Sequence, residues 1–160
     1  MSSALASWAP HVAATRLSRA QWEEVFHAVV VASGEGLGLA PAVTVDEEAH
    51  LGDSGAMLTL TTDDLSLALE VSGESHAIEK VARGLLMMEP DEEIDWEDVL
   101  DAVREVANVI AGALKTELIE TYPTLTLGLP HSDLAEDRQP RLRLSASMVD
   151  APVTVALLLA

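Results

Sequence analysis

Residues 95–120 carry the longest regular hydrophobic pattern in the chain, and its period is that of an α-helix. Apolar residues recur at spacings of three and four, which places them on one face of a helix that turns about 100° per residue. These positions are Trp96, Val99, Leu100, Val103, Val106, Ala107, Ile110, Ala113, Leu114 and Leu118. Asp95 is predicted to cap the helix, with Asp98 as a shorter version of the capping-box acid. The pattern predicts a long amphipathic helix with this face buried.

A second row of residues lies roughly opposite the apolar face of this predicted helix. Asp101, Glu105, Asn108 and Gly112 are spaced by four, three and four residues, and we call them the polar stripe. Glu105 and Asn108 are expected to be exposed neighbours. Gly112 removes side-chain bulk one turn further on, although glycine costs roughly 1 kcal/mol relative to alanine inside a helix. The polar stripe is therefore the best candidate for a functional surface.

The rest of the chain alternates between helical and strand-like patterns. Residues 65–71 show a period of two, with Leu65, Leu67, Leu69 and Val71 predicted inward and Ser66, Ala68 and Glu70 on a solvent face. In the same way, Leu125, Leu127 and Leu129 are expected to share one face of a strand. The predicted helices are residues 18–33, 75–88 and 95–120, and the predicted strands are residues 42–45, 57–61, 65–71, 125–130, 141–148 and 153–159.

This order of elements predicts an α+β domain. Short connections such as residues 62–64 and 149–152 imply antiparallel pairing, and a single sheet with helices on one face is the natural two-layer arrangement. Residues 1–18 are interpreted as an N-terminal lead-in and residues 19–160 as one domain.

Composition narrows the classes of function. The chain has 27 acidic and 9 basic residues, a formal charge of −18, which argues against nucleic acid and anionic membranes as partners. It contains no cysteine, and its five histidines have no ligand spacing, so no metal site is predicted. No apolar run is long enough to span a bilayer, and a cytoplasmic location is expected. Met87 and Met88 are interpreted as core residues at a helix end.

The run from Asp101 through Glu105, Asn108 and Gly112, followed by the segment LTLGLP at residues 125–130, resembles the signature helix of the CheC/CheX/FliY family. Members of this family dephosphorylate the chemotaxis response regulator CheY. The order of elements resembles that of CheX, the member with a single site. The first predicted helix lacks a second Glu-x-x-Asn, which argues against the two-site arrangement of CheC. The resemblance covers roughly residues 19–160, and it implies a two-layer CheX-like fold and a homodimer.

The resemblance also implies a mechanism. Asn108 would hold a water in line with the phosphorus of the regulator's phosphorylated Asp, and Glu105 would form a salt bridge with the regulator's active-site Lys. Asp101 and Gly112 would belong to the docking surface, although a local helix contact explains Asp101 equally well. The chain would need no cofactor of its own, since Mg²⁺ is expected on the phosphorylated CheY-like substrate.

Two positions depart from the family pattern. Arg104 stands where members often carry a small residue, and Ala113 stands where relatives often have Asn. Arg104 borders the polar stripe, so it would alter docking or suit a regulator other than CheY. The main alternative to a phosphatase is a non-catalytic module that binds a response regulator or another protein. These two hypotheses share every sequence feature except an active pair of Glu105 and Asn108.

Overall fold

The computed structural model describes residues 16–63 and 65–159, with three helices and a six-stranded sheet in this part of the chain. Residues 1–15, most of the predicted lead-in, lie outside the described residues. The elements in chain order are α2 (Arg19–Gly36), β1 (Ala42–Val45), β2 (Ser54–Thr62), β3 (Leu65–Gly73), α3 (Ser75–Leu85), α4 (Trp96–Leu118), β4 (Thr126–Leu127), β5 (Pro140–Met148) and β6 (Ala151–Leu159).

The six strands form one sheet in the order β1-β5-β6-β3-β2-β4, and every neighbouring pair is antiparallel. β5 and β6 are joined by the two-residue turn Val149–Asp150, in which both residues have positive φ angles of 46° and 62°. Such a turn matches the right-handed twist of the paired strands. The predicted α+β class and the antiparallel pairing are both confirmed.

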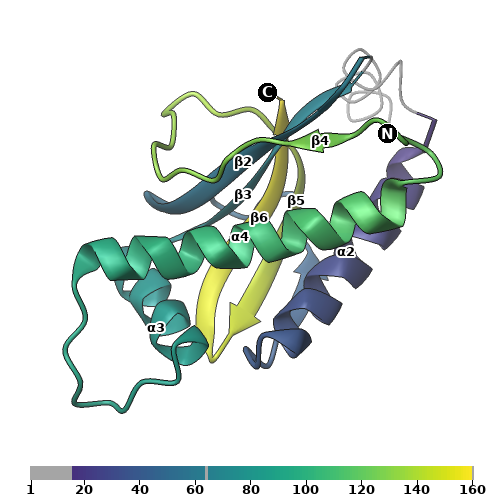
Figure 1. Ribbon diagram of the computed structural model, residues 1–160. Coiled ribbons are helices and arrows are strands. Elements are labelled where there is room, and N and C mark those ends of the chain that lie inside the picture. Colours follow the sequence, from purple (N-terminus) through teal and green to yellow (C-terminus); the bar gives the residue numbers. More distant parts are fainter. Residues whose placement is uncertain (1–15, 64, 160) are drawn as a thin grey trace.

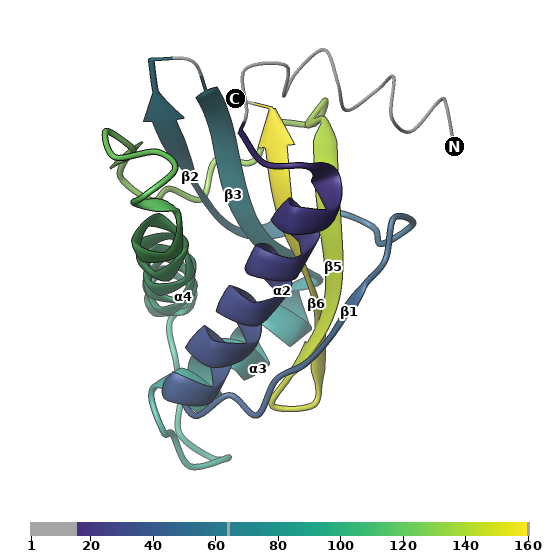
Figure 2. The same ribbon diagram turned by 90° about the vertical axis from the view of Figure 1, so that its right-hand side faces the viewer.

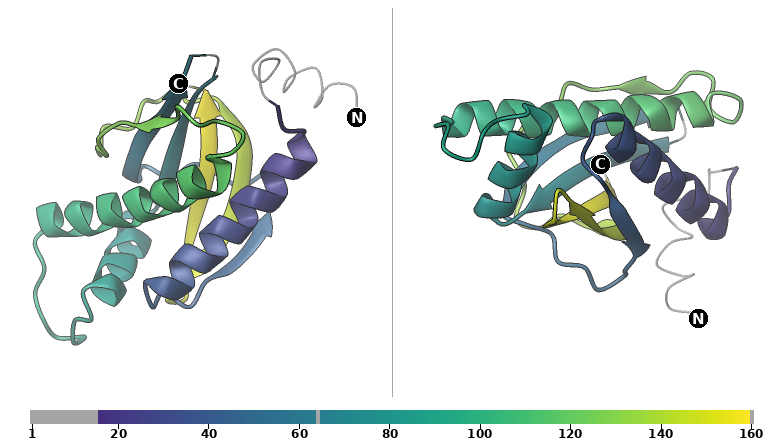
Figure 3. Two further views of the ribbon diagram at one scale, coloured as in Figure 1. Left: turned by 45° about the vertical axis from the view of Figure 1, so that its right-hand side comes forward. Right: turned by 90° about the horizontal axis from the view of Figure 1, so that it is seen from below.

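All three helices lie on the same face of the sheet (Figures 1 and 2). Their apolar sides and the inward strand residues form one continuous core, which includes Trp22, Phe26, Ile78, Ile110 and Leu69. Two views from other directions show α4 running across the strands and α2 lying beside it (Figure 3). The opposite side of α4 is left free by this packing.

The helix ends follow local signals in the sequence. α2 begins with a complete capping box, in which the Ser18 hydroxyl accepts a hydrogen bond from the Gln21 backbone N–H and the Gln21 side chain accepts one from the Ser18 N–H. It ends in the glycine-rich turn as predicted, with Gly38 at a φ of 74°. α4 differs from the prediction, because Asp95 is at the N-cap position but makes no side-chain capping bond.

The face of the sheet that points away from the helices is also partly buried, and this corrects the sequence prediction for β3. Ala68 and Glu70 are at most 1% exposed, whereas the period-two pattern placed them in solvent. Ala68 packs with Ala156 and Leu158 in a small second cluster, beside the partly buried Leu51 and Met57. The covering segments are the loop between β1 and β2 and the loop between β4 and β5.

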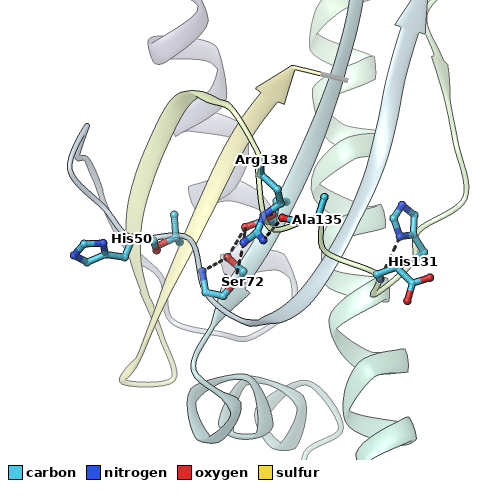
Figure 4. Close-up of polar contacts among 9 residues, drawn as sticks. His50, Ser72, His131, Ala135 and Arg138 are labelled. Carbon is cyan, nitrogen blue, oxygen red and sulfur yellow. Dashed lines mark hydrogen bonds and ion pairs between the residues drawn. The ribbon is translucent and has the colours of Figure 1, made fainter.

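Arg138 holds both loops against the sheet. Its guanidinium donates hydrogen bonds to the backbone carbonyls of Ala135 and Gly52 at 2.6 and 2.8 Å, and it forms an ion pair with Glu70. The Ser72 hydroxyl donates to Glu70 Oε2 at 2.6 Å and accepts the Gly52 N–H at 2.8 Å (Figure 4). Every charged or polar group in this cluster thus contributes to closing the outer face of the sheet.

β4 is shorter than predicted. Only Thr126 and Leu127 form a ladder with β2. Beyond them, the Gly128 N–H donates to the Thr59 carbonyl, and His131 and Met57 exchange backbone hydrogen bonds. Pro130 has no N–H to donate, which interrupts regular pairing here. Consequently, the three leucines do not share one face: Leu125 is buried, whereas Leu129 is 88% exposed.

A polar stripe on helix α4 as the candidate functional site

Helix α4 presents two chemically different sides. Nine of its residues are buried, including Val103, Ala107, Ile110 and Leu114, so the predicted apolar face is confirmed. Trp96 departs from the prediction, because it is the first residue of the helix and remains 43% exposed. Glu97 and Asp98 in the first turn place negative charge at the positive end of the helix dipole, which favours the helix.

The polar stripe lies on the solvent side of α4, as the spacing predicts. Asp101, Glu105 and Asn108 are exposed, and Gly112 is half-buried. Residues three apart on a helix have their Cβ atoms about 5–6 Å apart, so Glu105 and Asn108 are neighbours on this surface. Within the described residues, neither of their side chains has a hydrogen-bond or ion-pair partner. A carboxylate and an amide are therefore available side by side to another molecule.

Gly112 extends the exposed surface one turn beyond Asn108. A Cβ atom built at this position would have no heavy atom within 4 Å, apart from the helix itself and its chain neighbours. The fold therefore does not require glycine here, even though glycine weakens a helix interior. The open space above Gly112 would admit close approach of a second molecule's backbone.

Arg104 borders the polar stripe and organises the charges around it. Its guanidinium donates to Glu97 Oε1 at 2.9 Å and to the Ser132 hydroxyl at 3.0 Å, and it also forms an ion pair with Asp101. The hydrogen bond with Asp101, followed by that with Glu97, raises the pKa of Arg104 above its ordinary value. The local contact considered for Asp101 is thus present, and Glu105 is left as the unpaired acid beside it.

The sequence provided no reason to expect the link between Arg104 and Ser132. These residues are 28 positions apart and belong to α4 and to the loop between β4 and β5. The link holds that loop beside the N-terminal half of α4, on one flank of the polar stripe (Figure 1). No periodicity or motif marks a single serine in a polar loop, so only the folded chain reveals this contact.

An open groove lies on the other flank of α4, between the helix, the end of α3 and the connector of residues 86–95. Its volume is about 520 Å³, and Asp101, Ala102 and Glu105 form its wall on the α4 side. Leu86, which lines the groove, is 49% exposed. The next residue, Met87, is 89% exposed, which corrects the interpretation of Met87 as a core residue. The local sequence around Met87 does not distinguish an exposed methionine from a buried one at a helix end.

No group of three or more His, Asp or Glu residues in the described part of the chain could hold a metal ion. No helix in the described part is long and apolar enough to cross a membrane. His27 contacts the Val43 carbonyl oxygen and His131 accepts the Asp133 N–H, so both make local contacts.

Residues 55–149, more than half of the chain, match the family model described as chemotaxis phosphatase CheX. The chain belongs to the CheX family. This match spans the polar stripe, both flanking segments and strands β2 to β5. Among curated proteins, no sequence matches the chain.

Solved structures of CheX proteins share this fold. The chemotaxis protein CheX from Vibrio vulnificus has a TM-score of 0.67 and 14% identity, over 90% of this chain and 99% of that chain. CheX from Desulfovibrio desulfuricans has a TM-score of 0.61 and 18% identity, over 86% of this chain and 97% of that chain. The CheX-CheY-BeF₃-Mg²⁺ complex from Borrelia burgdorferi has a TM-score of 0.58 and 16% identity, over 85% of this chain and 95% of that chain. At these identities the likeness establishes the CheX fold.

Proposed function

We propose that this CheX-family protein dephosphorylates a CheY-like response regulator phosphorylated on aspartate. The observation that carries the proposal is the pair of Glu105 and Asn108, which are adjacent, exposed and without partners on the free side of α4. Support comes from the family match and from the CheX protein that was solved in complex with CheY, BeF₃ and Mg²⁺.

Asn108 would orient the water that attacks the phosphoryl group. Its amide oxygen can accept a hydrogen bond from this water, and the amide stays neutral next to the negative phosphate. The water oxygen forms a bond to phosphorus as the bond between phosphorus and the aspartate oxygen breaks. The products are a free aspartate carboxylate and inorganic phosphate, which carries the oxygen of the water. Because positioning supplies most of the catalysis in phosphoryl transfer, two well-placed side chains can suffice, with Asn108 acting on the water.

Glu105 would set the position of the regulator on α4. Its carboxylate has no cationic partner within the described residues and can pair with the Lys of the regulator's active site. Asp101 already forms an ion pair with Arg104, so Glu105 is the acid of the polar stripe that remains free for this contact. Mg²⁺ would be held by the regulator, and the chain itself would contribute no metal ligand.

The test measures phosphate release from a panel of phosphorylated regulators, with the unchanged chain and with Asn108→Ala. We expect accelerated release with the unchanged chain and the spontaneous rate with Asn108→Ala, because the substitution removes the group that acts on the water. Glu117→Ala serves as a control, since Glu117 is an exposed residue near the opposite end of α4. Binding of a regulator without faster release would favour the alternative, a non-catalytic binding module. Full activity of Asn108→Ala would refute the mechanism.

A further inference from the structure

The groove beside Glu105 combines an apolar interior with an acidic rim. Its apolar lining residues come from the end of α3, the connector and α4, and they are Leu85, Leu86, Met88, Ile94 and Ala102. Its acidic lining residues are Glu92, Glu93, Asp98, Asp101 and Glu105. Neither Lys nor Arg is among its lining residues, and the nearby Arg104 is paired with Asp101 and Glu97. The electrostatic character of the groove is therefore negative around an apolar centre.

The backbone at the edge of the groove exposes a large apolar side chain at an energetic cost. Met87 follows the C-cap of α3 and has a φ of 54°, a left-handed conformation that usually belongs to glycine at this position. For a residue with a Cβ atom, this conformation costs roughly 1–2 kcal/mol. Hydrogen bonds from the N–H groups of Met87 and Met88 to Gly84 and Arg83 hold the turn. Because the Met87 side chain is 89% exposed, packing within the described residues does not offset this backbone strain.

Exposed apolar side chains are concentrated near this groove. Six large hydrophobic residues of the described chain are exposed. One of them, Leu86, lines the groove, and another, Met87, is its neighbour in the chain and stands between the lining residues Leu86 and Met88. Flexible, polarisable methionine side chains are common on surfaces that bind protein partners. An exposed apolar patch with a polar rim is typical of a protein-interaction surface.

We infer that this groove is a second docking site for the phosphorylated regulator and that it selects the regulator. Its occupant would be a surface segment of the regulator that carries an apolar side chain flanked by Lys or Arg residues. Glu105 links the two sites, because the same side chain belongs to the polar stripe and lines the groove. A regulator that pairs with Glu105 must therefore lie against the groove, and its basic residues would meet the acidic rim. This inference rests on the proposed function.

If the groove docks the regulator, substitutions in it should weaken binding of the regulator and leave the chemical step unchanged. Leu86→Ala shortens the apolar contact inside the groove. Met87→Gly removes the exposed side chain between the lining residues Leu86 and Met88, and it suits the left-handed backbone, so a damaged fold would not explain its effect. Glu93→Lys reverses one rim charge, and the Glu93 side chain has no partner within the described residues. We expect each variant to raise the KM for the phosphorylated regulator about fivefold or more and to leave kcat unchanged.

Salt provides a readout that a structural defect would not produce. Rising ionic strength should raise the KM of the unchanged chain, and this dependence should become shallower in Glu93→Lys. Glu117→Lys is the matched control, because it makes the same charge change on an exposed residue far from the groove. It should leave both KM and its salt dependence close to those of the unchanged chain.

The outcomes separate this inference from the proposed function. If Asn108→Ala abolishes release while all three groove variants keep the original KM, the groove inference is overturned and the proposed function stands. If no regulator is dephosphorylated but one binds, and the groove variants weaken that binding, the groove inference stands and the proposed function falls. If no regulator binds at all, both fail. A change in self-association instead of KM would assign the groove to a second copy of the chain and overturn the inference.

Discussion

Arg138 forms an ion pair with Glu70, a residue of β3 whose side chain is fully buried on the outer face of the sheet. Arg138 lies 68 residues further along the chain, and its side chain is only 10% exposed. Removing one partner of a buried pair leaves an uncompensated charge. Since Arg138 also bonds to the carbonyls of Gly52 and Ala135, the pair connects both covering loops to β3.

Arg138→Ala is therefore expected to lower the free energy of unfolding by about 3–5 kcal/mol, which urea unfolding would measure. Adding Glu70→Gln in the same chain should recover part of the loss, because the buried charge is removed with its partner. The control is Glu136→Ala in the same loop, an exposed position where a change within about ±0.5 kcal/mol is expected. An equally small effect of Arg138→Ala would contradict the assigned role of the pair.

Glu105→Ala should affect the phosphatase reaction differently from Asn108→Ala. Loss of the docking carboxylate would mainly raise the KM for the phosphorylated regulator, whereas loss of the amide would mainly lower kcat. The combined variant should lose less than the sum of the single effects, because both residues act in one docked geometry. Steady-state phosphate release at several regulator concentrations measures all three. Strict additivity would argue that the two residues act independently.

Gly112→Ala should stabilise the protein and weaken its function. A Cβ atom at this position meets nothing within the described fold, so the substitution should raise the free energy of unfolding by roughly 0.5–1 kcal/mol through helix propensity alone. The same methyl group would stand in the space that a docked regulator needs and would raise KM. Thermal unfolding and phosphate release on one preparation would show both effects. A more stable variant with unchanged KM would place the regulator away from Gly112.

Arg104→Ala should alter the charge beside the site more than it alters stability. Partly exposed ion pairs such as those with Glu97 and Asp101 contribute about 0–1 kcal/mol each. Without the guanidinium, two acids near Glu105 lose their counter-charge, so a basic regulator surface should associate faster at low salt. Stopped-flow association at two salt concentrations tests this, and the difference from the unchanged chain should shrink at high salt. Slower association at low salt would instead assign Arg104 a direct contact with the regulator.

Homodimerisation stays a prediction. β1 forms one edge of the sheet, and Val45 at its end is 43% exposed. An edge strand of this kind can pair with another chain through its free backbone groups. Sedimentation equilibrium over a range of protein concentrations would measure the association. A monomer throughout the micromolar range would contradict a dimer.

The sequence by itself determined those features that depend on one element at a time. The spacing of Val103, Ala107, Ile110 and Leu114 specified which face of α4 is buried, and it thereby specified that Glu105 and Asn108 face away from the core. A helix repeats every 3.6 residues whatever packs against it, so local periodicity is sufficient for such a prediction. The strand alternation and the short connections likewise specified an antiparallel α+β fold.

Only the tertiary structure decided which of the remaining surfaces are covered. The alternation of β3 predicts that Glu70 faces solvent, yet Glu70 is buried because Arg138 and two distant loops close over it. The apolar side chain of Met87 predicts burial in the core. Met87 is nevertheless exposed, because it lies in the turn after α3 with a positive φ angle. In both cases, whether the side chain is buried depends on segments that are far apart in the chain or on one backbone angle. Hydrophobic periodicity carries no information about either. The groove beside Glu105 exists for the same reason, since α3, the connector and α4 form it only when they pack together.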